Sequence, residues 1–397
     1  MFINFNTEGI NLYFLCPFVC FFCLVGASYA AGQSSFGKNA FIQNMVVSLG
    51  EMLAIIPHLL SLKIDRDTYS NSERRSLPSE NVSSNNKKDL SIKLEYTNLE
   101  EDIQQISVFQ ILLLGFIDFL QSLCFFYGNY YTEYQLYIWS SHIFFLCLFT
   151  KQLLANKLYK HHFFSLVIFF CLDIIHNIFV ILDEHIKCEY EMYIFLFISS
   201  LCFSFELVFE KLLMEKHFIS IYKLCFLVGL STFFFNLIIS IIISIISSHL
   251  ENKPKYFFIY SEYFDEVSQN IVKEILIIII YMILTGLHNI FQFLTIKHLS
   301  PNHVLITQIM LAFYCSIMNV IIVNMDTITI IISMVFHSIC VVVFLIFLEI
   351  IELQCCGMDY DTIHNINKRA QLDKYLDNLT DNESSEDSDF NNEDNND

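Results

Sequence analysis

Apolar residues are grouped along this chain in blocks of about twenty, and polar and charged residues lie mainly between the blocks. A helix rises about 1.5 Å per residue, so a block of this length crosses a hydrocarbon core about 30 Å thick. The pattern predicts an all-α, polytopic membrane protein with about ten transmembrane helices. The predicted spans are 10–31, 41–62, 107–128, 134–150, 163–182, 192–210, 221–247, 273–295, 303–324 and 328–349.

Composition agrees with this pattern. Hydrophobic residues make up 55% of the 397, with 41 Phe and a mean hydropathy of +0.51, and charged residues make up only 16%. A soluble chain would distribute its apolar residues in short periodic runs. The lipid bilayer is therefore the first partner that the sequence predicts.

The first block has a second interpretation. Leu12 to Ala27, followed by the small residues from Ser28 to Gly32, resembles the apolar region and cleavage site of a signal peptide. The residues before it include no Lys or Arg but do include Glu8, whereas a signal peptide begins with a basic segment. This favours a retained span and leaves cleavage as the alternative.

Basic residues predict the orientation of the spans. If both termini are cytosolic, 17 of the 22 Lys and Arg residues fall on the cytosolic side of the membrane. An excess of Lys and Arg in short loops marks the cytoplasmic side. We therefore expect both termini to be cytosolic.

The blocks divide the chain into five parts. Residues 1–62 hold helices 1–2, 107–182 hold helices 3–5, and 183–350 hold helices 6–10. Residues 63–106, rich in Ser, Asn and charge, form a cytosolic disordered linker, and 351–397 form an acidic disordered cytosolic tail. Acidic residues outnumber basic ones by 13 to 3 in this tail, which argues against a nucleic-acid partner.

The order of spans and loops predicts two repeats. Spans 1–5 and 6–10 have equal helix numbers, and five is odd, so the two halves must have opposite orientations in the membrane. Many secondary carriers are built from such inverted repeats and hold their binding site near the membrane midplane. We therefore predict two inverted five-helix repeats.

Polar side chains within the spans are the candidate site residues, because each is costly at mid-bilayer unless it is paired or hydrated. Glu51 and Asp118 have no Lys or Arg in a nearby span, so these carboxylates need a hydrated cavity, a proton or a cationic ligand. The predicted substrate-binding residues are Glu51, Asp118, Gln121, Gln135, His142, His288, Asn289 and Gln292. For a lone Gln, Asn or His, an interhelical hydrogen bond is the alternative role.

Two other polar groups have simpler explanations. Glu206 and Glu210 lie near the predicted cytosolic end of span 6, where they could reach water beside Lys211. Thirteen Cys residues lie mostly within apolar blocks, where thiols behave as small hydrophobes. Because no Cys or His spacing resembles a zinc site, we expect no metal, and His161 and His162 are interpreted as interfacial residues.

Several short motifs resemble the nucleotide-sugar-transporter-like solute carriers of the drug/metabolite transporter superfamily, which includes the ten-helix EamA-type carriers. Phe41-Ile42-Gln43 followed by Ser48-Leu49-Gly50-Glu51 is similar to their "P-F-x-Q … F-L-G-E" pattern, and Tyr134-Gln135-Leu136 to their "S-x-Y-Q-M". Asp118, the segment 151–164, Phe209-Glu210-Lys211 and Gly229 also match, so the resemblance covers about 40–350.

The resemblance implies a ten-helix inverted-repeat fold, alternating access, no enzymatic activity and residence in an endomembrane such as Golgi, ER or lysosome/vacuole. It also places spans 5 and 10 at the periphery, so that Asp173, His176 and Asn177 would contact a neighbouring helix or a homodimer partner. Ile138-Trp139 replaces the family's Arg-Gly, and loss of this Arg argues against a nucleotide-sugar substrate.

These observations favour a secondary transporter for a small polar solute. No nucleotide-hydrolysis or hydrolase motif is present, so we predict no enzyme activity and no cofactor, with a membrane-embedded enzyme as a remote third option. The alternative from another class is a scaffold or receptor acting through its tail. Tyr360 to Ile363 fits a tyrosine-based sorting signal, in which Tyr360 and Ile363 would be the recognised residues, and Cys355 and Cys356 could be palmitoylated.

Overall fold

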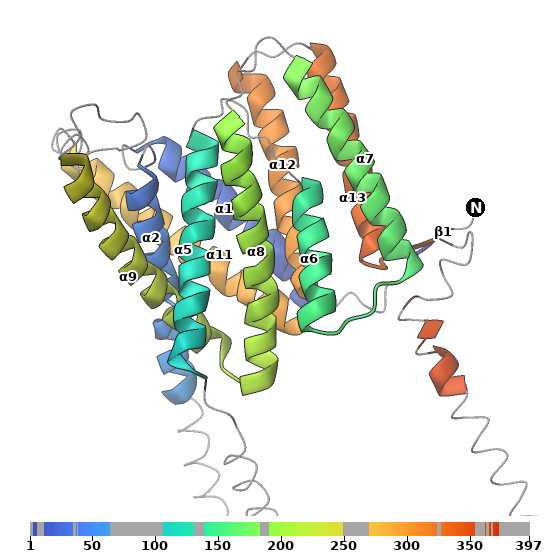
Figure 1. Ribbon diagram of the computed structural model, residues 1–397, viewed down its shortest axis with the longest axis horizontal. Coiled ribbons are helices and arrows are strands. Elements are labelled where there is room, and N and C mark those ends of the chain that lie inside the picture. Colours follow the sequence, from blue (N-terminus) through green and yellow to red (C-terminus); the bar gives the residue numbers. More distant parts are fainter. Residues whose placement is uncertain are drawn as a thin grey trace, which may run out of the picture.

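The computed structural model describes residues 3–5, 12–34, 37, 39–63, 106–130, 139–182, 190–248, 270–323 and 327–353, with 362, 365–366 and 368–372. These parts of the chain are almost entirely helical (Figure 1). A 3-10 helix at Leu12–Leu15 leads into α1. The helices are α1 (Cys16–Gly32), α2 (Ala40–Met52), α5 (Val108–Tyr130), α6 (Trp139–Leu153), α7 (Lys160–Leu182), α8 (Tyr190–His217), α9 (Ile221–Ser248), α11 (Ile271–His298), α12 (Pro301–Val323) and α13 (Thr327–Phe347).

Six helical segments of the described chain are long and apolar enough to cross a membrane. They are Leu12–Gly32, Ala40–Lys63, Val108–Gly128, Tyr193–His217, Ile221–Ile246 and Ile271–His298. The other predicted spans coincide with helices α6, α7, α12 and α13, which are outside this set of six. An all-helical chain with six membrane-length helices fits the predicted multi-pass membrane class.

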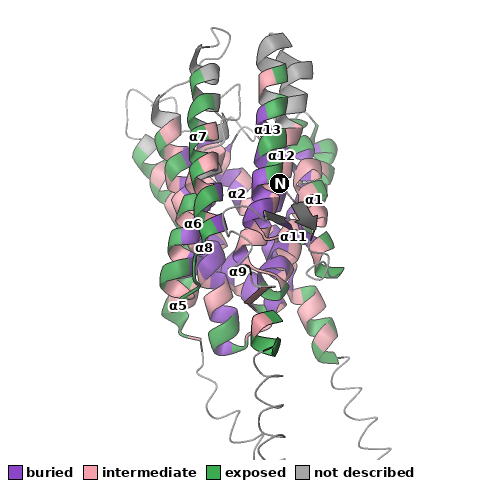
Figure 2. Ribbon diagram, turned by 90° about the vertical axis from the view of Figure 1, so that its right-hand side faces the viewer, coloured by how far each residue is buried: buried purple, intermediate pink, exposed green. Residues whose placement is uncertain are grey.

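The outer surface differs from that of a soluble bundle, although the interior is mainly apolar. Large apolar residues are exposed along the outer faces of helices, as on α9 at Phe234, Ile238 and Ile241. Polar residues such as Asn44 and Asn236 are fully buried inside. Figure 2 shows the exposed positions on the outside of the helices and the buried positions between them. A soluble protein does not expose apolar surface on this scale, so the outer face is suited to lipid.

The helices pack in a regular set of pairs. In the centre α2 packs on α9; α11 packs on α1 and α2, and α5 packs on α8 and α9. Around these, α12 contacts α1 and α6 contacts α8. Helices α7 and α13 lie side by side at one edge of the bundle, reached through α6 and α12 (Figure 1). This places predicted spans 5 and 10 at the periphery, as the resemblance implied.

A two-stranded ribbon joins the chain segment that precedes α1 to the segment that follows α13. Strand β1 (Ile3–Phe5) pairs antiparallel with β2 (Ile351–Leu353), with Asn4 opposite Glu352. The segment before α1 therefore lies beside the end of α13, on the same side of the bundle.

Two helix crossings bring backbones unusually close. A Cβ atom on Gly50 of α2 would lie 2.5 Å from the carbonyl oxygen of Met282 in α11, and one on Gly286 would lie 2.4 Å from the carbonyl oxygen of Gly50. At the second crossing, a Cβ on Gly115 of α5 would lie 2.4 Å from the Cβ of Ser231 in α9. Such approaches are possible only for glycine, and small residues drive helix association in membranes.

We expect Gly50→Ala and Gly286→Ala to force α2 and α11 apart, because each new methyl group would meet backbone atoms. Overpacking of this kind costs about 1–3 kcal/mol. The measurement is the thermal unfolding midpoint of the detergent-solubilised protein. Gly32→Ala is the matched control, since a Cβ there meets nothing within 4 Å; equal stability of all three variants would contradict the close crossing.

Candidate functional site

A cavity of about 500 Å³ lies inside the bundle, and seven helices contribute to its lining. Seven of the eight predicted substrate-binding residues line it together: Glu51, Asp118, Gln121, His142, His288, Asn289 and Gln292. The eighth, Gln135, lies outside the described residues, as do the side chains of Asp173, His176 and Asn177 and the tail positions Tyr360 and Ile363. Polar residues far apart in the sequence are thus brought to a single space.

Glu51 is held between three helices. It lies on α2 one residue after the close crossing at Gly50, and its Oε1 accepts a hydrogen bond from the Asn289 amide of α11. On the opposite side it packs against α9, where a Cβ on Gly229 would lie 2.5 Å from the Glu51 Cβ. Its Oε2 has no hydrogen-bond partner, and the residue is only 5% exposed. A buried carboxylate oxygen without a donor needs a proton or a ligand.

Asp118 of α5 lies where α5 packs against α9. The Thr232 hydroxyl of α9 donates to its Oδ2 at 2.6 Å, and also lies 3.1 Å from the Gly115 carbonyl oxygen. Asp118 is 4% exposed. Gln121 lies one turn further along α5 on the same face, as its spacing predicted, and accepts a hydrogen bond from Ser122 at 3.0 Å.

Glu206 and Glu210 do not lie at a solvent-exposed end of α8. Helix α8 continues to His217, so both residues lie well inside it; Glu206 is 5% exposed and lines the cavity, and Glu210 is fully buried. Lys211 pairs instead with Glu215 at 3.1 Å and donates to the Lys297 carbonyl oxygen at 2.9 Å. The interpretation that these acids reach water beside Lys211 is therefore corrected. One Glu206 oxygen and both Glu210 oxygens have no partner.

Further polar groups complete the lining. Gln43 donates from its amide to the Tyr281 hydroxyl at 3.2 Å, which joins α2 to α11. His288 and Cys20 join α11 to α1, with Nδ1 of His288 3.1 Å from the Cys20 carbonyl oxygen. Tyr281 was not a candidate from sequence, because a tyrosine in an apolar block carries no distinctive signal. The other lining residues outside the candidate set include Ser28, Phe125, Phe126, Phe203, Thr285, Gln308 and Tyr314.

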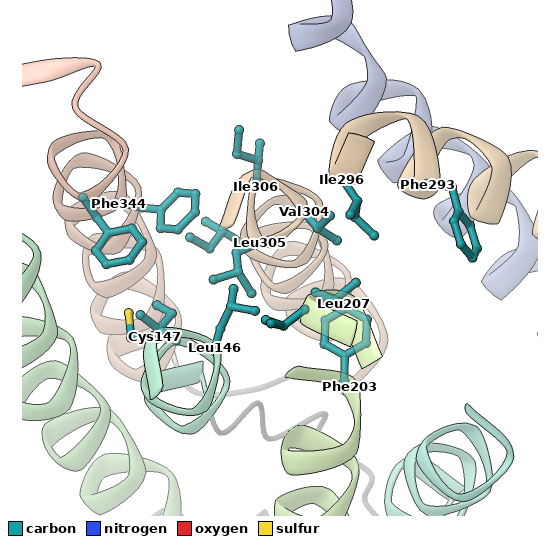
Figure 3. Close-up of a cluster of buried hydrophobic side chains, with 14 of the residues drawn as sticks. Leu146, Cys147, Phe203, Leu207, Phe293, Ile296, Val304, Leu305, Ile306 and Phe344 are labelled. Atoms are coloured by element: carbon teal, nitrogen blue, oxygen red, sulfur yellow. The ribbon is translucent and has the colours of Figure 1, made fainter. Parts of the chain in front are cut away.

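At one end the cavity is closed by an apolar plug. On six helices, an apolar residue at most 1% exposed lies one turn beyond a lining residue, towards the same end of the bundle. On α8 the acid Glu210, one turn beyond the lining residue Glu206, is also fully buried there. The apolar plug comprises Ala54, Leu114, Leu146, Leu207, Ile296 and Leu305, all in one hydrophobic cluster. Figure 3 shows Leu146, Leu207 and Leu305 converging from α6, α8 and α12. Towards the other end of the bundle, the lining reaches the exposed residues Ser28 and Gly32 of α1.

A separate polar cluster lies at the edge of the bundle. Atoms of His161, His162 and Glu349 that could bind a metal lie within 4.8 Å of one another. His161 Nε2 is 3.0 Å from Glu349 Oε1, and His162 Nδ1 accepts from the Tyr159 amide at 3.2 Å. These contacts join the start of α7 to Glu349, just past the end of α13, and the three side chains could together hold a metal ion. The position of the two histidines at the membrane interface stays a prediction.

Comparison with known proteins adds no relative: no protein-family model matches the chain, and no curated protein is significantly similar to it.

We expect Thr232→Val to destabilise the fold by about 1–3 kcal/mol, because it removes the Thr232 hydroxyl that donates to the buried Asp118 carboxyl while nearly preserving volume. Thr232→Ser keeps the hydroxyl and should retain most of the stability. The thermal midpoints of the two variants in detergent provide the measurement. If Val and Ser at this position are equally stable, the hydrogen bond to Asp118 contributes nothing.

Proposed function

We propose that this protein is a secondary, non-ATP-driven transporter that moves a small polar solute by alternating access. The observation that carries the proposal is the polar cavity closed at one end by the apolar plug. A carrier needs a solvated site inside the membrane and a barrier that can part on one side at a time. Six helices from both halves of the chain contribute to this barrier, so relative movement of the halves would open it.

An internal sequence similarity supports the inverted repeat. Gly115-x-x-Asp118-x-x-Gln121 of α5 has the same spacing as Gly286-x-x-Asn289-x-x-Gln292 of α11. Both glycines lie at the close crossings, and both third positions line the cavity. Asp118 forms a hydrogen bond with Thr232 of α9, which follows Ser231 at the crossing. Asn289 likewise forms a hydrogen bond with Glu51 of α2, which follows Gly50.

The helix pairs support the same relation. If the two halves are equivalent, α1 corresponds to α8, α2 to α9, α5 to α11, α6 to α12 and α7 to α13. Exchanging each helix for its counterpart converts the pair α1–α11 into α8–α5 and the pair α2–α11 into α9–α5. It also converts α1–α12 into α8–α6 and leaves α2–α9 and α7–α13 unchanged. All these pairs are in contact, as expected for two five-helix repeats about a central pseudo-two-fold axis.

The orientation from basic residues puts the apolar plug on the cytosolic side. Lys151, Lys211 and Lys297 follow the plug residues on α6, α8 and α11. The cavity would therefore face the side opposite the cytosol in this conformation. The two segments paired in the β1–β2 ribbon would then be cytosolic. The endomembrane location in this proposal comes from the resemblance to drug/metabolite transporters.

Alternating access predicts that the apolar plug opens in the folded protein. A cysteine at Leu305, now 1% exposed, should react with N-ethylmaleimide at least about tenfold faster than native Cys20, because opening costs far less than unfolding. Cys20 is equally buried, at 1% exposure, but lies between α1 and α11 outside the plug. Peptide mass spectrometry after timed alkylation in proteoliposomes gives both rates in one sample.

Ala54→Cys provides an independent second plug position, on a helix of the other half. If both introduced cysteines react as slowly as Cys20 at every temperature below unfolding, the bundle does not alternate and the transporter proposal is wrong.

Truncation after Gly357 separates the transporter from the scaffold alternative. The apolar plug, the cavity and the ribbon all precede this residue, so a carrier should keep its solute flux within about twofold. Flux is measured by mass spectrometry of a metabolite mixture taken up by proteoliposomes, with protein-free liposomes as the control. A full-length protein that takes up no solute, and whose cellular activity disappears with the tail, would favour a scaffold.

A further inference from the structure

The charge of the cavity lining is one-sided. Three carboxyl groups, those of Glu51, Asp118 and Glu206, line it, and Glu210 lies behind them with no exposure. None of the described lining residues is Lys or Arg. The nearest base along α8, Lys211, is already engaged with Glu215 and a backbone carbonyl. The protein therefore places several carboxyl groups in and behind this space without the counter-charge that they would require when ionised.

Two of these carboxyl groups each have one oxygen without a hydrogen-bond donor. Oε2 of Glu51 and Oε2 of Glu206 are buried without a partner, on side chains that line the cavity and residues only 5% exposed. The amides nearby are engaged elsewhere: Asn289 donates to the other oxygen of Glu51, and Gln43 donates to Tyr281. The two unpartnered oxygens belong to α2 and α8, one from each half of the chain.

Aromatic rings form much of the remaining lining. Phe125 and Phe126 of α5, Phe203 of α8, Tyr281 of α11 and Tyr314 of α12 all contribute. The face of an aromatic ring attracts a cation, by about 0.5–2 kcal/mol, and quaternary ammonium groups are recognised by such rings. Carboxylates combined with aromatic rings in an enclosed space are the chemistry expected of a cation site.

We propose that the cavity binds an organic monocation, a quaternary ammonium or protonated amine that carries an apolar group. The cationic centre lies between Glu51 and Glu206, and the apolar group lies against the aromatic rings. A volume of about 500 Å³ is sufficient for such a molecule. An anion, including a phosphorylated sugar, would find no Lys or Arg among the described lining residues to balance its charge. As an assignment of substrate class this rests on the proposed transport function, but the binding itself is measured without flux.

The test is equilibrium binding to the full-length, detergent-solubilised protein by isothermal titration calorimetry at constant ionic strength. Three probes share a benzyl or phenyl group: benzyltrimethylammonium is cationic, benzyl alcohol is neutral and benzenesulfonate is anionic. We expect the cation to bind at least about tenfold more tightly than either of the others. Equal or tighter binding of the neutral or anionic probe would overturn the proposal.

Variants locate the site. Glu206→Gln and Glu51→Gln should each weaken benzyltrimethylammonium binding by about tenfold or more. Glu215→Gln, on α8 but with a side chain 55% exposed and outside the cavity, is the matched control and should bind like the wild type. Unchanged affinity in both cavity variants would place the cation elsewhere and overturn the assignment.

Thermal unfolding of the wild-type protein with each probe tests the same preference without any variant that could fail to fold. Benzyltrimethylammonium should raise the thermal midpoint in proportion to its occupancy, whereas benzenesulfonate should not. If both or neither raise it, the cavity has no preference for cations. Failure here leaves the alkylation of a cysteine at Leu305 unaffected, and a bundle that does not alternate can still bind the cation, so the two proposals fail separately.

Discussion

The contact on which the rest of the structure depends is the backbone approach of α2 to α11 at Gly50 and Gly286, with its counterpart between α5 and α9 at Gly115. In lipid, apolar side chains gain little by leaving their surroundings for another helix, so association depends on close van der Waals packing and interhelical hydrogen bonds. Glycine permits that packing. The side chains next to each crossing are then directed to the neighbouring helix, which is how Glu51 meets Asn289 and Asp118 meets Thr232.

The same packing creates the contrast between the cavity and the apolar plug. On each of six helices, a residue that lines the polar cavity lies one turn from a residue that is buried in the apolar core of the protein. Ions would cross such an apolar seal at high cost. Because side chains from both halves form it, the proposed transport function would link movement of the halves to permeability.

Much of this was predictable from the sequence, and the exceptions have physical causes. Asp118 with Gln121, and His288 with Asn289 and Gln292, were assigned from helical spacing and the cost of polar groups in lipid, and all of them line the cavity. Spacing gives a face of a helix but neither depth nor partner. Glu206 was misplaced because the apolar block ends near Glu210, although α8 continues to His217 through residues that pack inside. The Gly50–Gly286 contact joins residues 236 positions apart, which no local pattern reveals.

The ribbon of β1 and β2 joins the segment before α1 to the segment after α13, so the first and last described helices are held together through their flanking strands. Residues 351–353 belong to the folded body, so any tail that acts independently begins after Leu353. Residues Ile3 to Phe5 belong to the folded body as well, because they provide the other strand. A reporter fused directly before β1 would therefore disturb the pairing of the two strands. A reporter fused at the far end of the acidic tail would leave the ribbon intact.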